Sequence, residues 1–538
     1  MVSAIDFDGS SYARNVSLDA NVDIFWTIDV EAETARVAVH ATDATGWVGV
    51  GVSEMGGMEG ADIVFYEVAS GEITDAHSIV AGAPVTDECT QDWTLLSAEA
   101  IDGSLVFEAE RALDTGDAQD RVFVDDTADG VVPTRLIAAW GDSETVSYHG
   151  TQWGKAEVVM FGGEESSNID PLLELKSDPG VSFFDVTARN FTIPAVRTHY
   201  EFTCLQASEL PDVEEFHIVG FEGVVQSDTA EYVHHLVLRG WYGVPDCGFA
   251  CMEWQNAVRA AAEANSTDVP AMPSICSQMD HANMYAWAPK IDGVALPEEA
   301  GFRFGNATGG FASVAVNTHY NNPGEVTGLV DDSGVRVYYT EELRPMDMGM
   351  IILGDPNATL RGEPIPEGKT SVSFGCPSSC TEEHFQVESV TIFSHFLHMH
   401  ENGQRLITRQ YRNDSGDEQL IHSAEVEYYS FLQAGGHTVY TDGTATIQRG
   451  DRFETECFYD TALSSTGSEN VMWGLGSENE MCLDFVTYYP TQNIPLSGSC
   501  GYLACGGALL QTIELAANSD FNRTFGTAAA TCTTNDDE

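Results

Sequence analysis

The 538-residue sequence is too long for a single hydrophobic core and predicts about three or four domains. Its 84 acidic and 23 basic side chains give a formal net charge of −61, which argues against nucleic acid and anionic membranes as partners. Acidity of this kind suits solubility or a salty medium and identifies no substrate.

The cysteines and sequons of the chain favour an oxidising compartment. Twelve cysteines lie mostly in loop-like contexts, as in Cys376-Pro-Ser-Ser-Cys380, and lack the Cys-x-x-Cys pairs of a zinc knuckle, so disulfides are expected. Seven Asn-x-Ser/Thr sequons fit a glycoprotein of the secretory route; they begin at Asn15, Asn190, Asn265, Asn306, Asn357, Asn413 and Asn522. We therefore expect a protein that is secreted or held in the secretory-pathway lumen.

The first residues, MVSAIDFDGS, have neither the basic nor the apolar region of a signal peptide, so such a peptide has been removed or never existed. No apolar run approaches the roughly 20 residues of a membrane-spanning helix.

Residues 16–163 predict a front β-sandwich, because short strands of alternating polarity are separated by turn residues, as in Ala35–His40 and Gly46–Val52. A polar, glycine-bearing stretch then begins at Gly162, and we interpret residues 164–181 as a linker.

Strand-like segments resume at about residue 182 and continue to about residue 490, which is too much β pattern for one sandwich. Two tandem antiparallel sandwiches are expected, over residues 182–340 and 341–495. An alanine-rich stretch from Glu253 to Ala264 predicts a helical insertion. The last segment, 496–538, carries Cys500, Cys505 and Cys532 and is expected to be a disulfide-bonded tail.

Three groups of histidines are candidate metal ligands: the adjacent pair His234 and His235, the single His319, and the pair His398 and His400. Residues two apart share one face of a strand, so His398 and His400 can direct both imidazoles at one ion. Adjacent residues face opposite ways, so His234 and His235 need a β-bulge or different ring nitrogens to bind one ion.

Neutral imidazoles suit copper, zinc, iron or nickel, whereas a thioether favours Cu(I), which makes Met481 a candidate ligand. Each motif alone also has an ordinary structural explanation. Met481 and His319 could be core residues, and a His-x-His pair is often a surface or core feature.

Taken in order, these segments resemble the copper type II, ascorbate-dependent monooxygenases over residues 182–490. The segments that carry the likeness are Val-His-His-Leu at 233–236, Thr-His-Tyr-Asn-Asn-Pro at 318–323, Leu-His-Met-His at 397–400, and Glu-Met-Cys-Leu-Asp-Phe-Val-Thr-Tyr-Tyr-Pro at 480–490. The resemblance implies jelly-roll-like copper domains and an enzyme that hydroxylates a substrate C–H bond with O2 and ascorbate.

The resemblance also assigns roles to residues. One copper, for electron transfer, would be held by His234, His235 and His319; a second, for oxygen binding and catalysis, by His398, His400 and Met481. A partly water-filled cleft would lie between the two domains. A disulfide between Cys457 and Cys482 is implied, and Tyr488 is a candidate for the substrate pocket.

Departures from the family pattern bear on the substrate. Peptide-amidating members bind a terminal carboxylate at places that here hold Phe396, Leu483 and Phe485, so a carboxylate would lack partners, and peptide amidation is not expected. The chain is closer to the dopamine β-hydroxylase branch, yet Ile351 and Ile352 stand where catecholamine-hydroxylating members place an acid. This favours a less polar small molecule.

Residues 16–163 resemble a DOMON domain through Gly46–Ser53, Gly56–Val64, Gln91–Leu96 and Ser147–Gly150. Three interpretations stay open. The module can be purely structural or a docking module, can bind a hard cation such as Ca²⁺ through Asp62 and Asp92, or can bind haem between Met58 and His149.

Two other functions compete with the oxygenase. One is a non-enzymatic secreted protein whose DOMON module binds haem, a cation or sugar. The other is a zinc hydrolase that uses His398 and His400, but no carboxylate base accompanies that pair, and Met481 is unsuited to zinc. A homodimer is left open.

Overall fold

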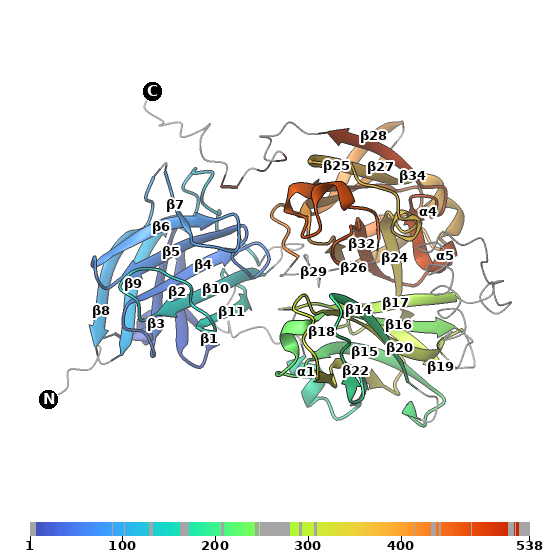
Figure 1. Cartoon of the computed structure of the whole chain (residues 1–538), viewed down its shortest axis with the longest axis horizontal. Helices are drawn as coiled ribbons and strands as arrows, with labels where there is room; N and C mark the ends of the chain where they lie inside the picture. Colours follow the sequence, from blue (N-terminus) through green and yellow to red (C-terminus); the bar gives the residue numbers. More distant parts are fainter. Residues whose placement is uncertain are drawn as a thin grey trace. The chain divides into compact units, whose positions relative to one another are not determined.

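A computed structural model shows an all-β protein (Figure 1). The structure describes residues 7–88, 90–101, 103–127, 133–161, 172–205, 209–242, 247, 280–289, 293–305, 309–414, 416–431, 437–440, 443–474, 476–514, 521, 523 and 525–526. Residues 164–171 of the predicted linker lie outside these residues, and its second half contains a short helix, α1 (Leu173–Ser177). The predicted helix over 253–264 lies wholly outside the described residues. Among the described residues, no helix is both long and apolar enough to cross a membrane.

The chain forms two compact units. Unit 1 consists of residues 1–169, 426–433 and 515–538, and unit 2 consists of residues 170–425 and 434–514. The front module therefore includes two short segments from late in the sequence, which its sequence pattern did not predict.

Unit 1 is the predicted β-sandwich. Its five-stranded sheet has the order β1-β2-β3-β9-β8, and its six-stranded sheet has the order β11-β10-β4-β5-β6-β7. The strands are β1 (Arg14–Asp19), β2 (Val22–Asp29), β3 (Thr34–Ala41), β4 (Trp47–Ser53), β5 (Ala61–Glu67), β6 (Glu72–Ser78), β7 (Val85–Thr86), β8 (Thr94–Ile101), β9 (Ser104–Ala112), β10 (Thr134–Gly141) and β11 (Trp153–Val158). Alternate residues of the strands, Trp26 and Phe107 among them, fill the space between the sheets.

The two late segments bind to one end of this sandwich. The partly buried Glu54 carboxylate accepts hydrogen bonds from the backbone N–H groups of Glu427 (2.8 Å) and Tyr428 (3.2 Å). The Tyr428 hydroxyl donates to the carbonyl of Phe525, whose ring lies 4.4 Å from the Arg121 guanidinium carbon. These contacts give unit 1 polar and aromatic partners that residues 16–163 alone do not supply.

The first part of unit 2 contains one continuous ten-stranded sheet rather than the two separate sheets of a standard sandwich. Its main path is β12-β22-β15-β19-β20-β16-β17, with β14, β18 and β23 joined to β20, β15 and β19. Because one core collects buried residues from most of these strands, the sheet must curve around that core. The strands are β12 (Val181–Thr187), β14 (Thr198–Cys204), β15 (Glu215–Val224), β16 (Val233–Tyr242), β17 (Asp280–Trp287), β18 (Val294–Ala295), β19 (Ala300–Gly305), β20 (Phe311–Asn321), β22 (Gly334–Thr340) and β23 (Met346–Asp347).

The second part of unit 2 is a sandwich of two sheets. One has the order β29-β26-β32-β24-β33, with β30 on β26, and the other has the order β28-β27-β31-β25-β34. The strands are β24 (Gly349–Gly354), β25 (Lys369–Cys376), β26 (Ser389–His398), β27 (Gly403–Asp414), β28 (Asp417–Val426), β29 (His437–Val439), β30 (Thr446–Gln448), β31 (Arg452–Asp460), β32 (Leu483–Tyr489), β33 (Ser499–Gly501) and β34 (Ala508–Glu514).

The expected separate tail is thus partly a component of this sandwich, because β33 pairs with β24 and β34 pairs with β25. Disulfides Cys376–Cys500 and Cys380–Cys505 fix the segment there, while Cys532 lies outside the described residues. The expected disulfide Cys457–Cys482 is confirmed, and Cys204–Cys247 closes a loop of the first part.

Candidate active site

The first histidine group lies where β16 and β20 pair. The antiparallel register sets His235 directly opposite His319. A register shift between Val233 and His235 places a bulge at His234, which is one of the two ways in which adjacent residues can bind one ion. One ring nitrogen from each of His234, His235 and His319 lies within 4.8 Å of the others, so the three imidazoles can share one ion.

His234 and His319 are buried and His235 is partly buried, and neighbouring side chains hold these imidazoles in place. The Tyr200 ring stacks on His319 at 4.2 Å between ring centroids, and Ser477 Oγ lies 3.1 Å from His319 Nε2. Within the described part of the chain, His235 Nδ1 and His319 Nδ1 are buried and have no hydrogen-bond partner. Buried lone pairs of this kind are costly unless a ligand takes them up.

The second group lies at the end of β26. The rings of His398 and His400 are 5.1 Å apart and nearly perpendicular. His400 Nδ1 lies 3.2 Å from the carbonyl oxygen of Asn479, and donation to that oxygen leaves Nε2 for a metal.

Glu480 joins this histidine pair to the methionine. One oxygen of its fully buried carboxylate accepts hydrogen bonds from the backbone N–H groups of His400 (2.9 Å) and Met481 (3.3 Å). The other oxygen accepts a hydrogen bond from the backbone N–H of Asn402. A single buried side chain therefore fixes the backbone at two of the three predicted ligands. The sequence contained one signal for Glu480, its position directly before Met481.

The two groups adjoin each other in this structure. The rings of His235 and His398 are 5.4 Å apart, close to the spacing within each group. The water-filled cleft expected between the centres is therefore closed at this point.

Burial lowers the pKa values of His234, His235, His319 and His398 well below the usual histidine range, and it lowers the pKa of His400 to about 4. All five side chains are therefore neutral near pH 7 and present lone pairs to a metal. Five neutral imidazoles, with a methionine whose backbone shares the Glu480 carboxylate with His400, fit copper. They do not fit Ca²⁺ or Mg²⁺, which prefer oxygen ligands.

An apolar cavity of about 30 Å³ lies beside the second group, between β17 on one side and β24, β26 and β32 on the other. Phe396, whose ring is 6.0 Å from that of His398, lines it. None of its lining residues carries a charged side chain; they are Phe221, Val237, Asn283, Met284, Tyr285, Ala286, Val294, Leu296, Met350, Phe393, Ser394, Phe396, Phe485 and Thr487.

Comparison with known families decides the identity of unit 2. Residues 184–327 match the copper type II ascorbate-dependent monooxygenase N-terminal domain, and residues 346–501 match the C-terminal domain of the same family. Together these matches cover more than half of the chain. The chain belongs to the copper type II ascorbate-dependent monooxygenases. Residues 18–132 match the DOMON domain.

Curated relatives of this monooxygenase are similar over most of their length. The chain is 26% identical to dopamine beta-hydroxylase of Canis lupus familiaris, over 89% of this chain and 72% of the relative. It is 28% identical to DBH-like monooxygenase protein 1 of Gallus gallus, over 84% and 68%. It is 26% identical to tyramine beta-hydroxylase of Caenorhabditis briggsae, over 90% and 77%. The protein is a copper- and ascorbate-dependent hydroxylating monooxygenase.

Tyr488 does not line the cavity beside the second histidine group. The regular pairing of β32 with β24 puts Asp484, Val486 and Tyr488 on one face and Leu483, Phe485 and Thr487 on the other. Tyr488 packs in the sandwich core, whereas Phe485 and Thr487 line the cavity. This cavity therefore gives no support to the predicted substrate-pocket role of Tyr488, because the motif gives the order of the residues and not the face of the strand on which each lies.

In the DOMON module, the structure groups Asp62 with Asp75 and Asp120 rather than with Asp92. The Asp62 carboxylate accepts a hydrogen bond from Arg111, with 2.7 Å between Arg111 Nη1 and Asp62 Oδ2. Asp92 contributes its backbone N–H, which donates to Asp75 Oδ2, and within the described residues Asp75 Oδ1 has no partner. Burial, with the neighbouring carboxylates, raises the pKa of Asp75 to about 8; burial also raises that of Asp120 to about 7.

The DOMON module does not bring Met58 and His149 together. Met58 follows the end of β4 at Ser53, and His149 follows the end of β10 at Gly141. Because these strands are antiparallel, with Arg135 opposite Ser53 and Gly141 opposite Trp47, the two loops lie at opposite ends of the sheet. The pair cannot hold one haem in this arrangement.

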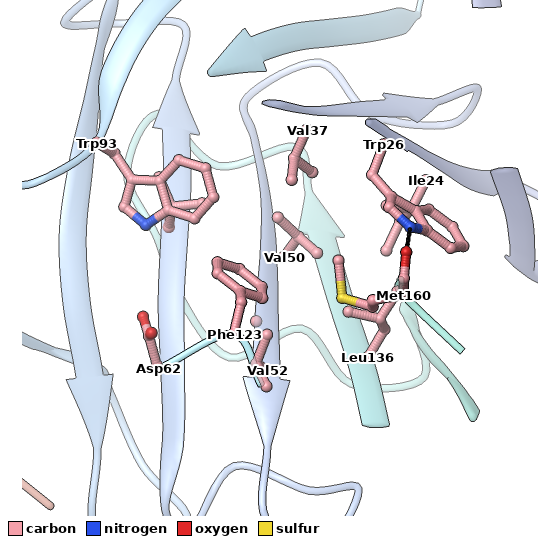
Figure 2. A pocket seen from close by; sticks show the side chains of 12 residues that line it. Ile24, Trp26, Val37, Val50, Val52, Asp62, Trp93, Phe123, Leu136 and Met160 are labelled. Carbon is pink, nitrogen blue, oxygen red and sulfur yellow. Dashed lines mark hydrogen bonds between the residues drawn. The ribbon is translucent and has the colours of Figure 1, made fainter. Parts of the chain in front are cut away.

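The cavity inside the DOMON sandwich is apolar and small, with a volume of about 20 Å³ (Figure 2). Figure 2 shows the Trp93 and Phe123 rings and the Asp62 carboxylate at its wall, and Trp26 Nε1 donates to the Met160 carbonyl at 3.1 Å. This space holds about one water and is too small for haem or sugar.

Proposed function

We propose that this monooxygenase uses two copper ions, one held by His234, His235 and His319 and one by His398, His400 and Met481. The observation that carries the proposal is the presence of buried, neutral imidazoles in two groups, with unpartnered nitrogens on His235, His319 and His398 among the described residues. Copper, when bound, supplies the electron transfer and oxygen activation by which O2, a substrate C–H bond, two electrons from ascorbate and two protons give an alcohol and water.

The chain's own residues prepare the site. Tyr200 and Ser477 fix the orientation of His319, and Glu480 fixes the backbone of His400 and Met481. Burial keeps the imidazoles neutral, so they need lose no proton before they bind a metal.

Copper content after reconstitution and dialysis tests this assignment. Elemental analysis of the wild type should give two ions per chain, and His319→Ala and Met481→Ala should each weaken one site. His384→Ala, which removes a half-buried histidine on α4 (Ser378–His384) of the second sandwich, is the control and should keep both. A wild type that retains no copper, or ligand variants that bind as the wild type does, would refute the assignment.

We infer that the substrate is a small, neutral and largely apolar molecule rather than a peptide C-terminus. The cavity beside His398 offers aromatic side chains such as Phe396 and Phe485 and no charge to pair with a carboxylate or an ammonium. Asn283 Oδ1 is buried in its wall without a hydrogen-bond partner among the described residues, and it suits a substrate hydroxyl. A substrate must displace lining side chains such as Met350, because the present volume is about 30 Å³.

Substrate competition checks this inference. Ascorbate-dependent product formation should be fastest, by kcat/KM, with a neutral arylalkane or arylalkanol and slower with the matching amine or an N-acylglycine. Thr487→Asp, which places a carboxylate in the cavity wall, should shift the ratio toward the amine. A wild type that prefers the amine or the N-acylglycine would contradict a neutral substrate.

For the DOMON module we propose a hard cation, Ca²⁺ for example, at Asp62, Asp75 and Asp120. The support is a buried group of three carboxylates with a single guanidinium, Arg111, against two of them. A cation would let Asp75 and Asp120 ionise at neutral pH. For the whole chain, the disulfides and the sequons support a secretory-pathway location.

A further inference from the structure

Strand β26 carries histidines on both of its faces. From Ser394 to His398 its pairing with β32 is regular, with Phe396 opposite Phe485 and Leu397 opposite Asp484. Phe396 and His398 therefore share the face that carries the copper ligand. His395 shares the opposite face, toward the sandwich interior, with Asp484 of β32.

The interior face holds a buried histidine, His395, whose Nε2 has no hydrogen-bond partner among the described residues. His395 is 1% exposed and Asp484 is fully buried, and His395 Nδ1 donates to Asp484 Oδ2 at 2.8 Å. This hydrogen bond leaves the lone pair on Nε2, for which no hydrogen-bond partner exists within the described residues. A carboxylate behind one ring nitrogen and an open lone pair on the other is the usual support of a metal-binding histidine.

A second imidazole and a phenol approach from the rest of the sandwich. His422 lies on β28, where Ala424 and Val426, at the same strand phase, are buried. Its ring is 5.3 Å from that of His395, close to the 5.1 Å between His398 and His400. The Tyr440 hydroxyl is 3.2 Å from His422 Nε2. Two ligand atoms of a tetrahedral site with bonds of about 2.0 Å are about 3.3 Å apart. The 3.2 Å between the Tyr440 hydroxyl and His422 Nε2 therefore fits two ligands of a shared ion.

We propose that His395, His422 and Tyr440 form a third metal site, for a divalent transition-metal ion such as Zn²⁺ or Cu²⁺. The ion would join β26 and β28, which belong to opposite sheets, and water would complete its coordination. Burial lowers the pKa of His422 to about 4, so its imidazole is neutral and can ligate near pH 7. The inference does not rest on the proposed copper sites, whose single ligand on β26, His398, lies on the other face of that strand.

Cobalt(II) is a suitable probe of this site. The full-length protein is first loaded with copper and reduced with ascorbate, because Cu(I) has no d–d absorption. Co²⁺ with nitrogen ligands in a site of low coordination number then gives strong visible bands, whereas Co²⁺ on surface carboxylates absorbs weakly. We expect one strongly absorbing Co²⁺ per wild-type chain, with unchanged copper content.

The variants separate this site from the others. His422→Ala should abolish the strong bands, Tyr440→Phe should shift or weaken them, and Asp484→Asn should weaken Co²⁺ binding about 10- to 100-fold. His384→Ala should leave the spectrum unchanged. Strong bands that are absent in the wild type, or that persist in His422→Ala, would overturn the proposal, and copper content measured on the same samples reports separately on the copper sites.

Discussion

Glu480 shows how one buried side chain can set the geometry of a proposed metal site without being one of its ligands. Its carboxylate is fully buried, and burial raises its pKa to about 8, yet it accepts backbone N–H groups from both sides of the site. Backbone donors that would otherwise be unsatisfied are thus paired. His400 and Met481 depend on it for their relative position.

We predict that Glu480→Ala weakens copper binding at the methionine-containing group by at least about tenfold, as loss of a supporting partner commonly does. Binding at the His234 group should change little, because its ligands lie on other strands. Copper titration followed by elemental analysis measures both sites. Glu478→Ala, in the same loop but partly exposed, is the control, and equal affinities in the two variants would exclude the positioning role.

The main errors of sequence interpretation also lie at the residue scale. The bulge at His234 could be predicted only as one of two ways in which adjacent residues can bind one ion, and the register shows that it is present. The face of β32 on which Tyr488 lies could not be predicted, because a motif gives the order of residues but not the orientation of the strand. His395 went unnoticed because its partners, Asp484 and His422, are distant in sequence.

At the scale of elements, disulfide Cys457–Cys482 connects β31 to the start of β32. Cys482 of this disulfide is adjacent to Met481 in the sequence. The hydroxyl of Tyr459, two residues beyond Cys457, donates a hydrogen bond to the Met481 carbonyl at 2.8 Å. The disulfide and the hydrogen bond thus hold the methionine segment against a central strand of the opposite sheet.

Removing this disulfide should reduce both stability and copper affinity. For Cys457→Ser/Cys482→Ser, loss of the 25-residue cross-link should lower the free energy of unfolding by about 3 kcal/mol. Copper binding at the Met481 group should weaken as well. Cys380→Ser/Cys505→Ser is the matched control, because that disulfide lies in the same sandwich and should affect stability alone. Denaturant unfolding and copper titration separate the two effects, and equal copper affinities in the two double variants would contradict this expectation.

Sequence patterns predicted the elements better than their associations. Alternation of apolar and polar residues predicted an all-β chain, and the Cys457–Cys482 pairing followed from a family likeness. The joining of ten strands into one sheet, and the addition of β33 and β34 to the second sandwich, depend on contacts between distant segments that no local pattern encodes.

At the scale of the whole molecule, stability depends on pH through buried carboxylates such as Asp75, which burial and the neighbouring Asp120 and Asp62 make harder to ionise. Its pKa is about 8 in the folded protein, against about 3.8 as the ordinary value. The folded state therefore holds this proton more tightly than the unfolded state. The stability that this group contributes is present below about pH 4 and is lost progressively as the pH rises toward 8.

A bound cation should reverse this loss. We predict that Ca²⁺ raises the melting temperature of the DOMON transition more at pH 8 than at pH 5, because it binds the ionised carboxylates. Asp75→Asn should remove most of the Ca²⁺ effect and flatten the pH dependence, and Asp92→Asn should have the smaller effect. Differential scanning calorimetry at the two pH values checks this, and a Ca²⁺ shift that is equal in the wild type and Asp75→Asn would contradict the site.

The two late segments of unit 1 have a practical consequence for dividing the protein into fragments. The chain passes between the units four times, at residues 169/170, 425/426, 433/434 and 514/515. A recombinant fragment that ends at residue 169 would leave the Glu54 carboxylate without the N–H groups of Glu427 and Tyr428, and would uncover the surface that Phe525 occupies. Gene truncation at the apparent domain boundary should therefore yield a less soluble product, and a circularly permuted or co-expressed form that restores residues 426–433 and 515–538 is the better reagent.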